Sequence, residues 1–320
     1  MALNAEKYGT ELVNKLASVT NKIDLLITEI ASTSETSNIY WTRRQVQLKK
    51  LYEQARLISI NWTNERIPIV YRDQIRQQFY KLKNRKIKPV QLKKVKFSDF
   101  INTNSVVQSL RSLLSETSAT FSIGYLSGEK TIRRLMNLTQ QIHIREKEIE
   151  KQIAQGFIEK GTVTQSVKRL QGELLKKSLN GQYITVINKN GDPMQFKVST
   201  YSDMVAKTKL IEAQTQAVVN TTAGLGEDLV QVSSHNTETA YDAQFEGKIF
   251  SLSGNDPDFP IATDLPPFHP RCKHSISTVI KEGLEADGTL QEYIDFSNNA
   301  IEKHPTRKSH TPVSKRGTLK

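Results

Sequence analysis

Cysteine is almost absent from this sequence, since Cys272 is the only one among 320 residues. A single cysteine cannot form an internal disulfide, so the chain lacks the disulfide framework that is typical of many small secreted proteins. We therefore expect the protein to reside in a reducing compartment.

Long hydrophobic runs are missing as well. No stretch approaches the roughly 20 apolar residues that span a bilayer, and Met1–Lys7 lacks the basic and apolar regions of a secretory signal. We expect a soluble protein that is not exported and has no membrane partner. Hydrophobic residues make up 37% of the chain and aromatic residues only 7%. This polar composition suits long helices with one buried stripe each.

Acidic residues are too few to balance the basic ones. The chain has 45 lysines and arginines against 33 aspartates and glutamates, which gives a formal net charge of +12. A surface this basic attracts polyanions, chiefly nucleic acid or an acidic protein. The length allows two domains, each with a core of its own.

The spacing of apolar residues predicts a helix-rich N-terminal region. Leu12, Leu16, Val19 and Ile23 recur three and four positions apart, which indicates an amphipathic helix from residue 5 to about 32. The same reasoning predicts helices at about 40–60, 72–83, 104–115, 131–155 and 162–177.

Residues 81–96 carry many cations and no intervening carboxylate. Such a run is not expected to be a packed element, and we interpret it as a basic linker. It either lies on DNA phosphates with a salt-dependent affinity or is a solvated connector. The candidate DNA-binding residues are Lys81, Lys83, Arg85, Lys86, Lys88, Lys93, Lys94 and Lys96.

The pattern changes at Tyr183, where β-branched and aromatic runs begin. Strands are predicted at 183–188 and 194–198 around the hairpin signal Asn190-Gly191. A helix from 203 to about 222 follows, with Ser202 as its N-cap and Gly224 at C′. Further strands are predicted at 229–233, 248–252 and 275–280.

These elements predict the α+β class: a helix-rich N-terminal region followed by a small mixed α+β domain. We place the helical region at 1–178, the α+β domain at 179–285 and a basic tail at 286–320. Beyond about residue 300 the chain has almost no apolar residues, so we expect this tail to be disordered. The tail either binds DNA or a partner, or is a solvated terminus.

Chemically distinctive residues concentrate in the segment 265–274, a loop rich in proline. Imidazole nitrogen and thiolate sulfur are ligands that zinc prefers, and His269, Cys272 and His274 supply three of them. His235 is the candidate fourth ligand. The alternative is a metal-free loop whose histidines form local hydrogen bonds.

Motifs for catalysis are weak. A nuclease would use His235 or His274 as general acid or base, but no paired carboxylate motif for magnesium is present, and Asn255–Asp258 is typical of a turn. A phosphate-binding glycine loop is also missing. We therefore expect no enzymatic activity and no cofactor other than zinc. Candidate residues for phosphate charge are Lys248, Arg271 and Lys273.

Five segments of the C-terminal half carry a recognisable pattern. They are Tyr201–Thr208, Ala217–Asn220, Gly226–His235, Glu246–Ser253 and Pro266–His274. Their content and order resemble the head morphogenesis or minor capsid proteins of tailed phages, the family typified by the Mu-type F protein. The resemblance covers roughly residues 160 to 285, and the block ending in His-Pro-x-Cys-x-His is its most specific part.

The resemblance implies a structural role for an α+β domain behind a helical region. Family members are made in the host cytoplasm and lie in few copies inside the virion, where they act in head assembly or genome delivery. The implied partners are the portal protein, the major capsid protein and non-specific double-stranded DNA. The alternative from another class is a phage-carried nuclease or transferase effector that uses the region of His235 and His274.

Two positions depart from the family pattern. Many relatives carry a Cys-x-x-Cys or similar polar pair where this chain has Ala240–Ala243, so half of a four-ligand site is expected to be missing. Lys207 stands where an arginine is often found, which keeps the charge but loses planar bidentate hydrogen bonding.

Overall fold

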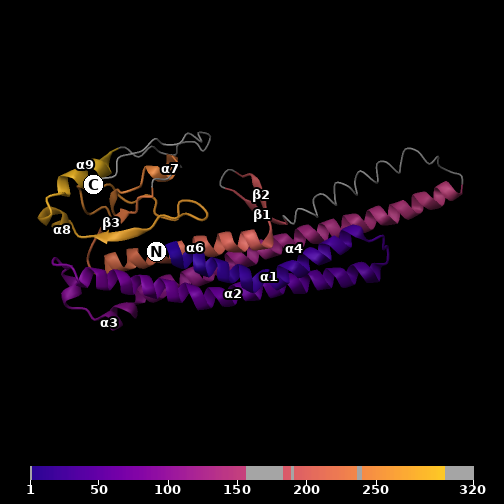
Figure 1. The fold of residues 1–320 in the computed structure, drawn as a ribbon, viewed down its shortest axis with the longest axis horizontal. Coiled ribbons are helices and arrows are strands. Elements are labelled where there is room, and N and C mark those ends of the chain that lie inside the picture. The colour runs from indigo at the N-terminus through magenta and orange to yellow at the C-terminus, as the bar shows by residue number, and fades with distance from the viewer. Residues whose placement is uncertain (1, 156–182, 189–190, 236–239, 300–320) are drawn as a thin grey trace. The chain divides into compact units, whose positions relative to one another are not determined.

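The structure, a computed structural model, describes residues 2–155, 183–188, 191–235 and 240–299. It confirms the predicted class, because a helix-rich N-terminal region precedes a small mixed α+β region (Figure 1). The predicted helix at 162–177 and the predicted tail beyond 300 lie outside the described residues.

The helices are α1 (Ala2–Ser32), α2 (Asn38–Lys83), η1 (Gln91–Lys93, a 3-10 helix), α3 (Phe97–Ile101), α4 (Asn104–Ala154), α6 (Val198–Gly224), α7 (Ala240–Ala243), α8 (Lys281–Ala286) and α9 (Leu290–Asn298). The strands are β1 (Ile184–Ile187), β2 (Pro193–Phe196), β3 (Leu229–Val232), β4 (Ile249–Ser251) and β5 (Ile276–Val279).

Four of the predicted helices form only two. The helices predicted at 40–60 and 72–83 are one helix, α2, and those at 104–115 and 131–155 are one helix, α4. Pro68 lies inside α2, where it removes one backbone donor. Ile67 and Val70 on either side of it are buried, and this burial sustains the helix through the proline. None of the described helices has an apolar stretch long enough to cross a membrane.

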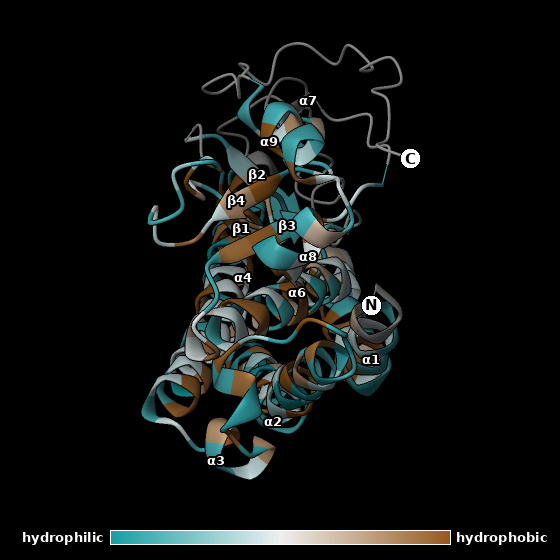
Figure 2. Ribbon diagram, turned by 90° about the vertical axis from the view of Figure 1, so that its left-hand side faces the viewer, coloured by the Kyte–Doolittle hydropathy of each residue, from teal (hydrophilic) through white to brown (hydrophobic). Residues whose placement is uncertain are grey.

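The described chain divides into two compact units that are built from separate segments. We call Gly9–Thr63 with Thr117–Met204 the helical unit. The sheet unit contains Met1–Tyr8, Asn64–Glu116 and the chain from Val205 onward. The units therefore alternate along the chain instead of following one another. The helices α1 and α4 carry hydrophobic and hydrophilic residues on different faces (Figure 2).

A buried hydrogen-bond chain runs through the aromatic core of the helical unit. Tyr125 Oη lies 2.6 Å from Ser59 Oγ and 2.8 Å from Ser202 Oγ. Ser202, the predicted N-cap, is thus a buried residue inside α6, which begins four residues earlier. Gly124 leaves room for the ring of Tyr201, which a Cβ at this position would overlap.

The predicted hairpin is present in the helical unit as β1 and β2. The strands are antiparallel, with Ile184 opposite Phe196 and Ile187 opposite Pro193. Gly191 has φ +86°, a conformation that glycine adopts without steric cost. The N–H of Gly191 donates to Asn188 O at 3.0 Å, so the chain turns before Gly191, as predicted.

An antiparallel sheet of order β4-β3-β5 forms the centre of the sheet unit. Its two faces follow from the alternation of side chains along a strand. On one face, Val230 and Val232 of β3 share a hydrophobic cluster with Val218 of α6. On the other face, Leu229 lies in a second cluster, against which residues of α8 and α9 pack: Leu284, Leu290, Tyr293 and Ile294.

The predicted boundary at residue 285 is wrong, because α9 continues the packed structure to Asn298. The backbone N–H of Ile249 in β4 donates to Ser297 Oγ at 3.0 Å. Figure 1 shows α8 and α9 next to each other beside the sheet. The apolar residues of α9 cover the sheet, so this part of the predicted tail belongs to the fold.

The C-terminus of α6 ends in a Schellman motif with Gly226, and not the predicted Gly224, at C′. The N–H of Glu227 donates to Thr222 O, and the N–H of Gly226 donates to Ala223 O. Gly226 has φ +78° as the motif requires. Gly224 serves packing instead, because a Cβ there would lie 2.5 Å from the ring of Phe100.

Candidate metal centre

The register of the sheet brings three loops to one end of it. Val232, the last residue of β3, pairs with Ile276 at the start of β5, and its neighbour Gln231 pairs with Ile249 at the start of β4. The residues just after β3 and those just before β4 and β5 must therefore meet. These are the positions that hold His235, Asp242 and Glu246, and the segment from His269 to His274.

A tight turn shapes the loop that carries His269, Cys272 and His274. The N–H of Cys272 donates to His269 O at 3.1 Å, and Arg271 adopts a left-handed backbone with φ 62°. The N–H of Arg271 donates to Thr208 Oγ1 of α6, which ties the turn to the helix. Phe268 anchors the loop in the core that covers β3.

The turn brings three potential ligands together, with a fourth beside them. One donor atom each of Asp242, His269 and Cys272 lies within 4.8 Å of the other two. The separation of Asp242 Oδ2 and His269 Nε2 is 2.7 Å. His274 Nδ1 lies 3.3 Å from Cys272 Sγ and 3.9 Å from Asp242 Oδ2. The structure therefore brings together three of the residues predicted from sequence and adds a carboxylate.

Burial differs among the four side chains. Asp242, Cys272 and His274 are almost fully buried, whereas the side chain of His269 is 33% exposed. An ion would therefore reach the group from the side of His269. The loop 236–239, which precedes α7, lies outside the described residues.

The charges of the group are strongly coupled. The carboxylate of Asp242 raises the pKa of His269 to about 9, against the effect of burial. Burial alone would raise the pKa of Cys272, but hydrogen bonds from His274 and Phe268 outweigh it and lower that pKa. Burial alone would lower the pKa of His274, but Cys272 and Glu246 outweigh it and raise that pKa. Each shift favours the ionic form of its side chain.

His235 does not join these ligands. Its Nε2 lies 2.9 Å from Ser233 Oγ, and its ring meets the ring of His274 edge on, with centroids 5.1 Å apart. Asp242 occupies the fourth position that the sequence had assigned to His235. The signal that was missed is the carboxylate within Ala240–Ala243, the segment in which we expected two ligands to be absent.

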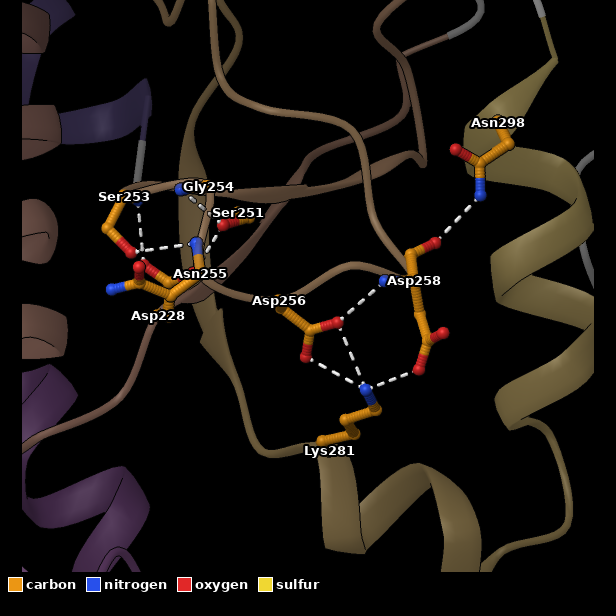
Figure 3. A network of polar contacts seen from close by, with 9 residues as sticks. All are labelled: Asp228, Ser251, Ser253, Gly254, Asn255, Asp256, Asp258, Lys281 and Asn298. Atoms are coloured by element: carbon orange, nitrogen blue, oxygen red, sulfur yellow. Dashed lines mark hydrogen bonds and ion pairs between the residues drawn. The ribbon is translucent and has the colours of Figure 1, made fainter.

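The acidic turn at Asn255–Asp258 holds a lysine. Lys281 Nζ donates to both carboxylate oxygens of Asp256, at 3.0 and 2.9 Å, and to Asp258 Oδ2 at 2.5 Å (Figure 3). The N–H of Asp258 donates to Asp256 Oδ1, which confirms the predicted turn. The ammonium group occupies the space between these carboxylates and offsets one of their two negative charges.

The cations of 81–96 are all exposed, but the segment is packed, contrary to expectation. Lys81 and Lys83 lie in the last turn of α2, and Lys93 lies in η1. Leu82 and Leu92 are buried, so apolar side chains hold the segment to the sheet unit. The cations face solvent from a fixed surface rather than from a free linker.

The residues considered for a nuclease differ in exposure. His274 is buried, and Lys248 is 4% exposed with its Nζ donating to Asn299 O at 2.6 Å. Arg271 and Lys273 are exposed. Lys207, at the position where the family often has arginine, bonds to Glu6 Oε1 at 2.7 Å.

No family model, curated protein or solved structure matches this chain.

Proposed function

We propose that this chain is a minor capsid, or head morphogenesis, protein of a tailed phage. In this proposal it is made in the host cytoplasm and lies inside the virion, where it contacts the portal protein, the major capsid protein and packaged DNA. Its role in head assembly or genome delivery is structural and not enzymatic.

The observation that carries this proposal is the convergence of the five family-like segments. Val218, Val232, Phe250 and Cys272 come from four of them and share one hydrophobic cluster. The first segment joins through Thr208, which accepts the hydrogen bond from the turn of the fifth. Segments separated along the chain therefore build one core, which supports reading them together as a domain.

A structural role agrees with how the polar groups of this domain are used. Lys248 and His274 are buried and bonded within the protein, and so are not directed at a substrate in solvent. The exposed cations of 81–96 provide a basic surface that suits DNA phosphates. DNA binding of this kind is independent of base sequence.

The decisive experiment is to co-express the chain with the portal and major capsid proteins of its phage and to purify the particles. We expect a few copies per particle by quantitative mass spectrometry, and we expect them to stay with the portal when the shell is dissociated. Purified particles that contain no copy of the co-expressed chain would refute the proposal. Copies that stay with the shell would assign the contact to the major capsid protein.

A nuclease assay tests the alternative class. The purified protein is incubated with labelled DNA and RNA in the presence of magnesium, manganese or zinc, and we expect no degradation. Degradation that disappears in both His235→Ala and His274→Ala would replace the structural proposal by an effector nuclease. Degradation that both variants retain would indicate a contaminant or a different site.

A further inference from the structure

We propose that Asp242, His269, Cys272 and His274 bind one zinc ion that clamps α7 to the turn preceding β5. This inference rests on the geometry of the sheet unit and does not depend on the proposed function. It replaces the ligand set expected from sequence, because Asp242 takes the place of His235.

The spacing of the four donor atoms suits a tetrahedral ion. Zinc bonds of about 2.0–2.3 Å place neighbouring donors of a tetrahedron roughly 3.3–3.8 Å apart. The distances from Asp242 Oδ2 to His269 Nε2 (2.7 Å), from Cys272 Sγ to His274 Nδ1 (3.3 Å) and from Asp242 Oδ2 to His274 Nδ1 (3.9 Å) scatter around this range. Asp242, His269 and Cys272 form the group of donors that lie within 4.8 Å of one another, and His274 lies beside it. A zinc ion held by Asp242, His269 and Cys272 would gain His274 as its fourth ligand once the two histidine rings move closer together.

The tautomer of His269 allows a cation to lie between this residue and Asp242. His269 Nδ1 lies 2.9 Å from the carbonyl oxygen of Pro270, which can only accept, so Nδ1 carries the proton. In a neutral ring, Nε2 then presents a lone pair to Asp242 Oδ2, only 2.7 Å away. Two facing lone pairs repel unless a cation lies between them or Nε2 is protonated.

The orientation of His274 is also fixed, in this case by the carboxylate of Glu246. Its Nε2 lies 2.8 Å from Glu246 Oε1, so Nε2–H donates to Glu246 and Nδ1 is left to face Cys272 Sγ. A carboxylate that fixes the far nitrogen of a ligating histidine is a recurrent outer shell of zinc sites. The N–H of His274 also donates to Cys272 Sγ at 3.4 Å, which supports a thiolate.

An unsatisfied buried atom completes the argument. Asp242 Oδ2 is buried and lies 2.7 Å from His269 Nε2, a contact that does not meet the geometry of a hydrogen bond. Facing a neutral imidazole, this buried carboxylate oxygen would be costly, and a bound cation removes that cost. The rival state is a metal-free ion pair of Asp242 with a protonated His269.

The donor set selects the metal. Two imidazoles, one thiolate and one carboxylate suit zinc, whereas magnesium and calcium prefer oxygen donors only. Four protein ligands leave no open position, which is typical of structural and not of catalytic zinc. The ion would join α7 to the turn that is anchored by Phe268.

The test measures zinc in the full chain purified without chelators. We expect about one zinc ion per chain by elemental mass spectrometry, and a lower melting temperature after chelation that zinc restores. Replacement by cobalt should give the strong visible absorption of a tetrahedral site and a thiolate charge-transfer band that Cys272→Ser removes.

Matched variants identify the ligands. Asp242→Asn is expected to lower zinc affinity at least about tenfold, whereas His235→Gln, a change at an exposed neighbouring histidine, should leave it unchanged. If a ligand variant does not fold, chelation and cobalt titration of the unmodified chain give the answer. Absence of zinc together with a melting temperature insensitive to zinc and chelator would overturn the proposal and favour the metal-free ion pair. Loss of zinc in His235→Gln but not in Asp242→Asn would restore the ligand set expected from sequence.

Discussion

At the scale of single residues, Asp228 shows how one carboxylate organises a loop. It accepts hydrogen bonds from Ser251 Oγ and, at 2.8 Å, from the N–H of Ser253 (Figure 3). Ser251 Oγ in turn accepts from the N–H of Gly254 at 2.8 Å. The carboxylate thereby holds the start of the loop that follows β4 against the residue that precedes β3.

We expect Asp228→Asn to destabilise the protein by about 1–3 kcal/mol. The asparagine NH2 group would replace one carboxylate oxygen and would face a hydrogen-bond donor, either Ser251 Oγ–H or Ser253 N–H, in a half-buried position. Urea unfolding followed by circular dichroism measures the change. Asp287→Asn, at an exposed position of the same unit, is the matched control and should have no effect. Equal stability of the two variants would contradict the role assigned to Asp228.

The same group makes stability depend on pH. Burial tends to raise the pKa of Asp228, but the hydrogen bonds from Ser251 and Ser253 outweigh it and hold that pKa below its usual value. A carboxyl group with a lowered folded-state pKa stabilises the protein above its unfolded pKa of about 3.9, and the contribution is lost as pH falls further. Unfolding free energies measured from pH 6 down to about pH 3 should therefore fall less steeply in Asp228→Asn than in the unmodified chain. Parallel curves would argue against this linkage.

The candidate site also shows what sequence reasoning reaches at this scale. His269, Cys272 and His274 lie close in the sequence, so their clustering was visible from composition and spacing. Asp242 lies outside that loop and meets it only through the register of the sheet. An aspartate in a polar chain carries no distinctive signal, so the fourth ligand required the fold.

At the scale of elements, the end of α6 depends on one backbone conformation. Gly226 at C′ has φ +78°, and a Cβ there would lie 3.2 Å from the flexible side chain of Gln91. Gly226→Ala is expected to cost about 1–2 kcal/mol of stability from the left-handed backbone, and Gly226→Asn less. The control is Gly283→Ala in α8, where the nearest atom to an added Cβ lies 4.0 Å away. This substitution should leave the stability unchanged or increase it. Thermal unfolding of the three variants distinguishes a conformational cost from a general intolerance of side chains.

The helix α9 gives a second prediction at this scale. A chain that ends at residue 286, near the boundary expected from sequence, would expose Leu229, Ile249 and Phe259, which α9 helps to cover. We expect this truncation to lower the melting temperature and to increase binding of a hydrophobic dye. A chain that ends at residue 299 retains α9 and serves as the control. If both truncated chains have the same melting temperature as the full chain, α9 does not contribute to the stability of the core.

The elements that sequence predicted well are those with a strong local signal. α1 follows from its apolar spacing and the β1–β2 hairpin from Asn-Gly. The sequence predicts two helices in place of α2 and two in place of α4, because Pro68 and polar stretches weaken the local apolar pattern. In the structure, burial of other residues maintains each helix. The short helix α9 was assigned to the tail because its apolar residues gain their stabilisation from the sheet rather than from local propensity.

At the scale of the whole molecule, the excess of positive charge sets the interaction with polyanions. Forty-five basic residues against 33 acidic ones give a net charge of +12, which attracts DNA from any direction. The cations of 81–96 differ from the rest in being concentrated on one packed segment with no carboxylate among them. The question is whether DNA affinity comes from this segment or from net charge alone.

We expect DNA affinity to depend on the segment. A variant with Lys83, Arg85, Lys86 and Lys88 replaced by glutamine should bind duplex DNA more weakly. The slope of log affinity against log salt should decrease in size by up to about 3.6, because each lost phosphate contact contributes about 0.9. The control replaces Arg43, Lys49, Lys50 and Arg134, which are exposed cations of the helical unit. Both variants lose four positive charges, so net charge alone predicts equal losses in fluorescence anisotropy titrations. A larger loss in the first variant would locate the DNA contact on the segment, whereas equal losses would show that the segment has no special role.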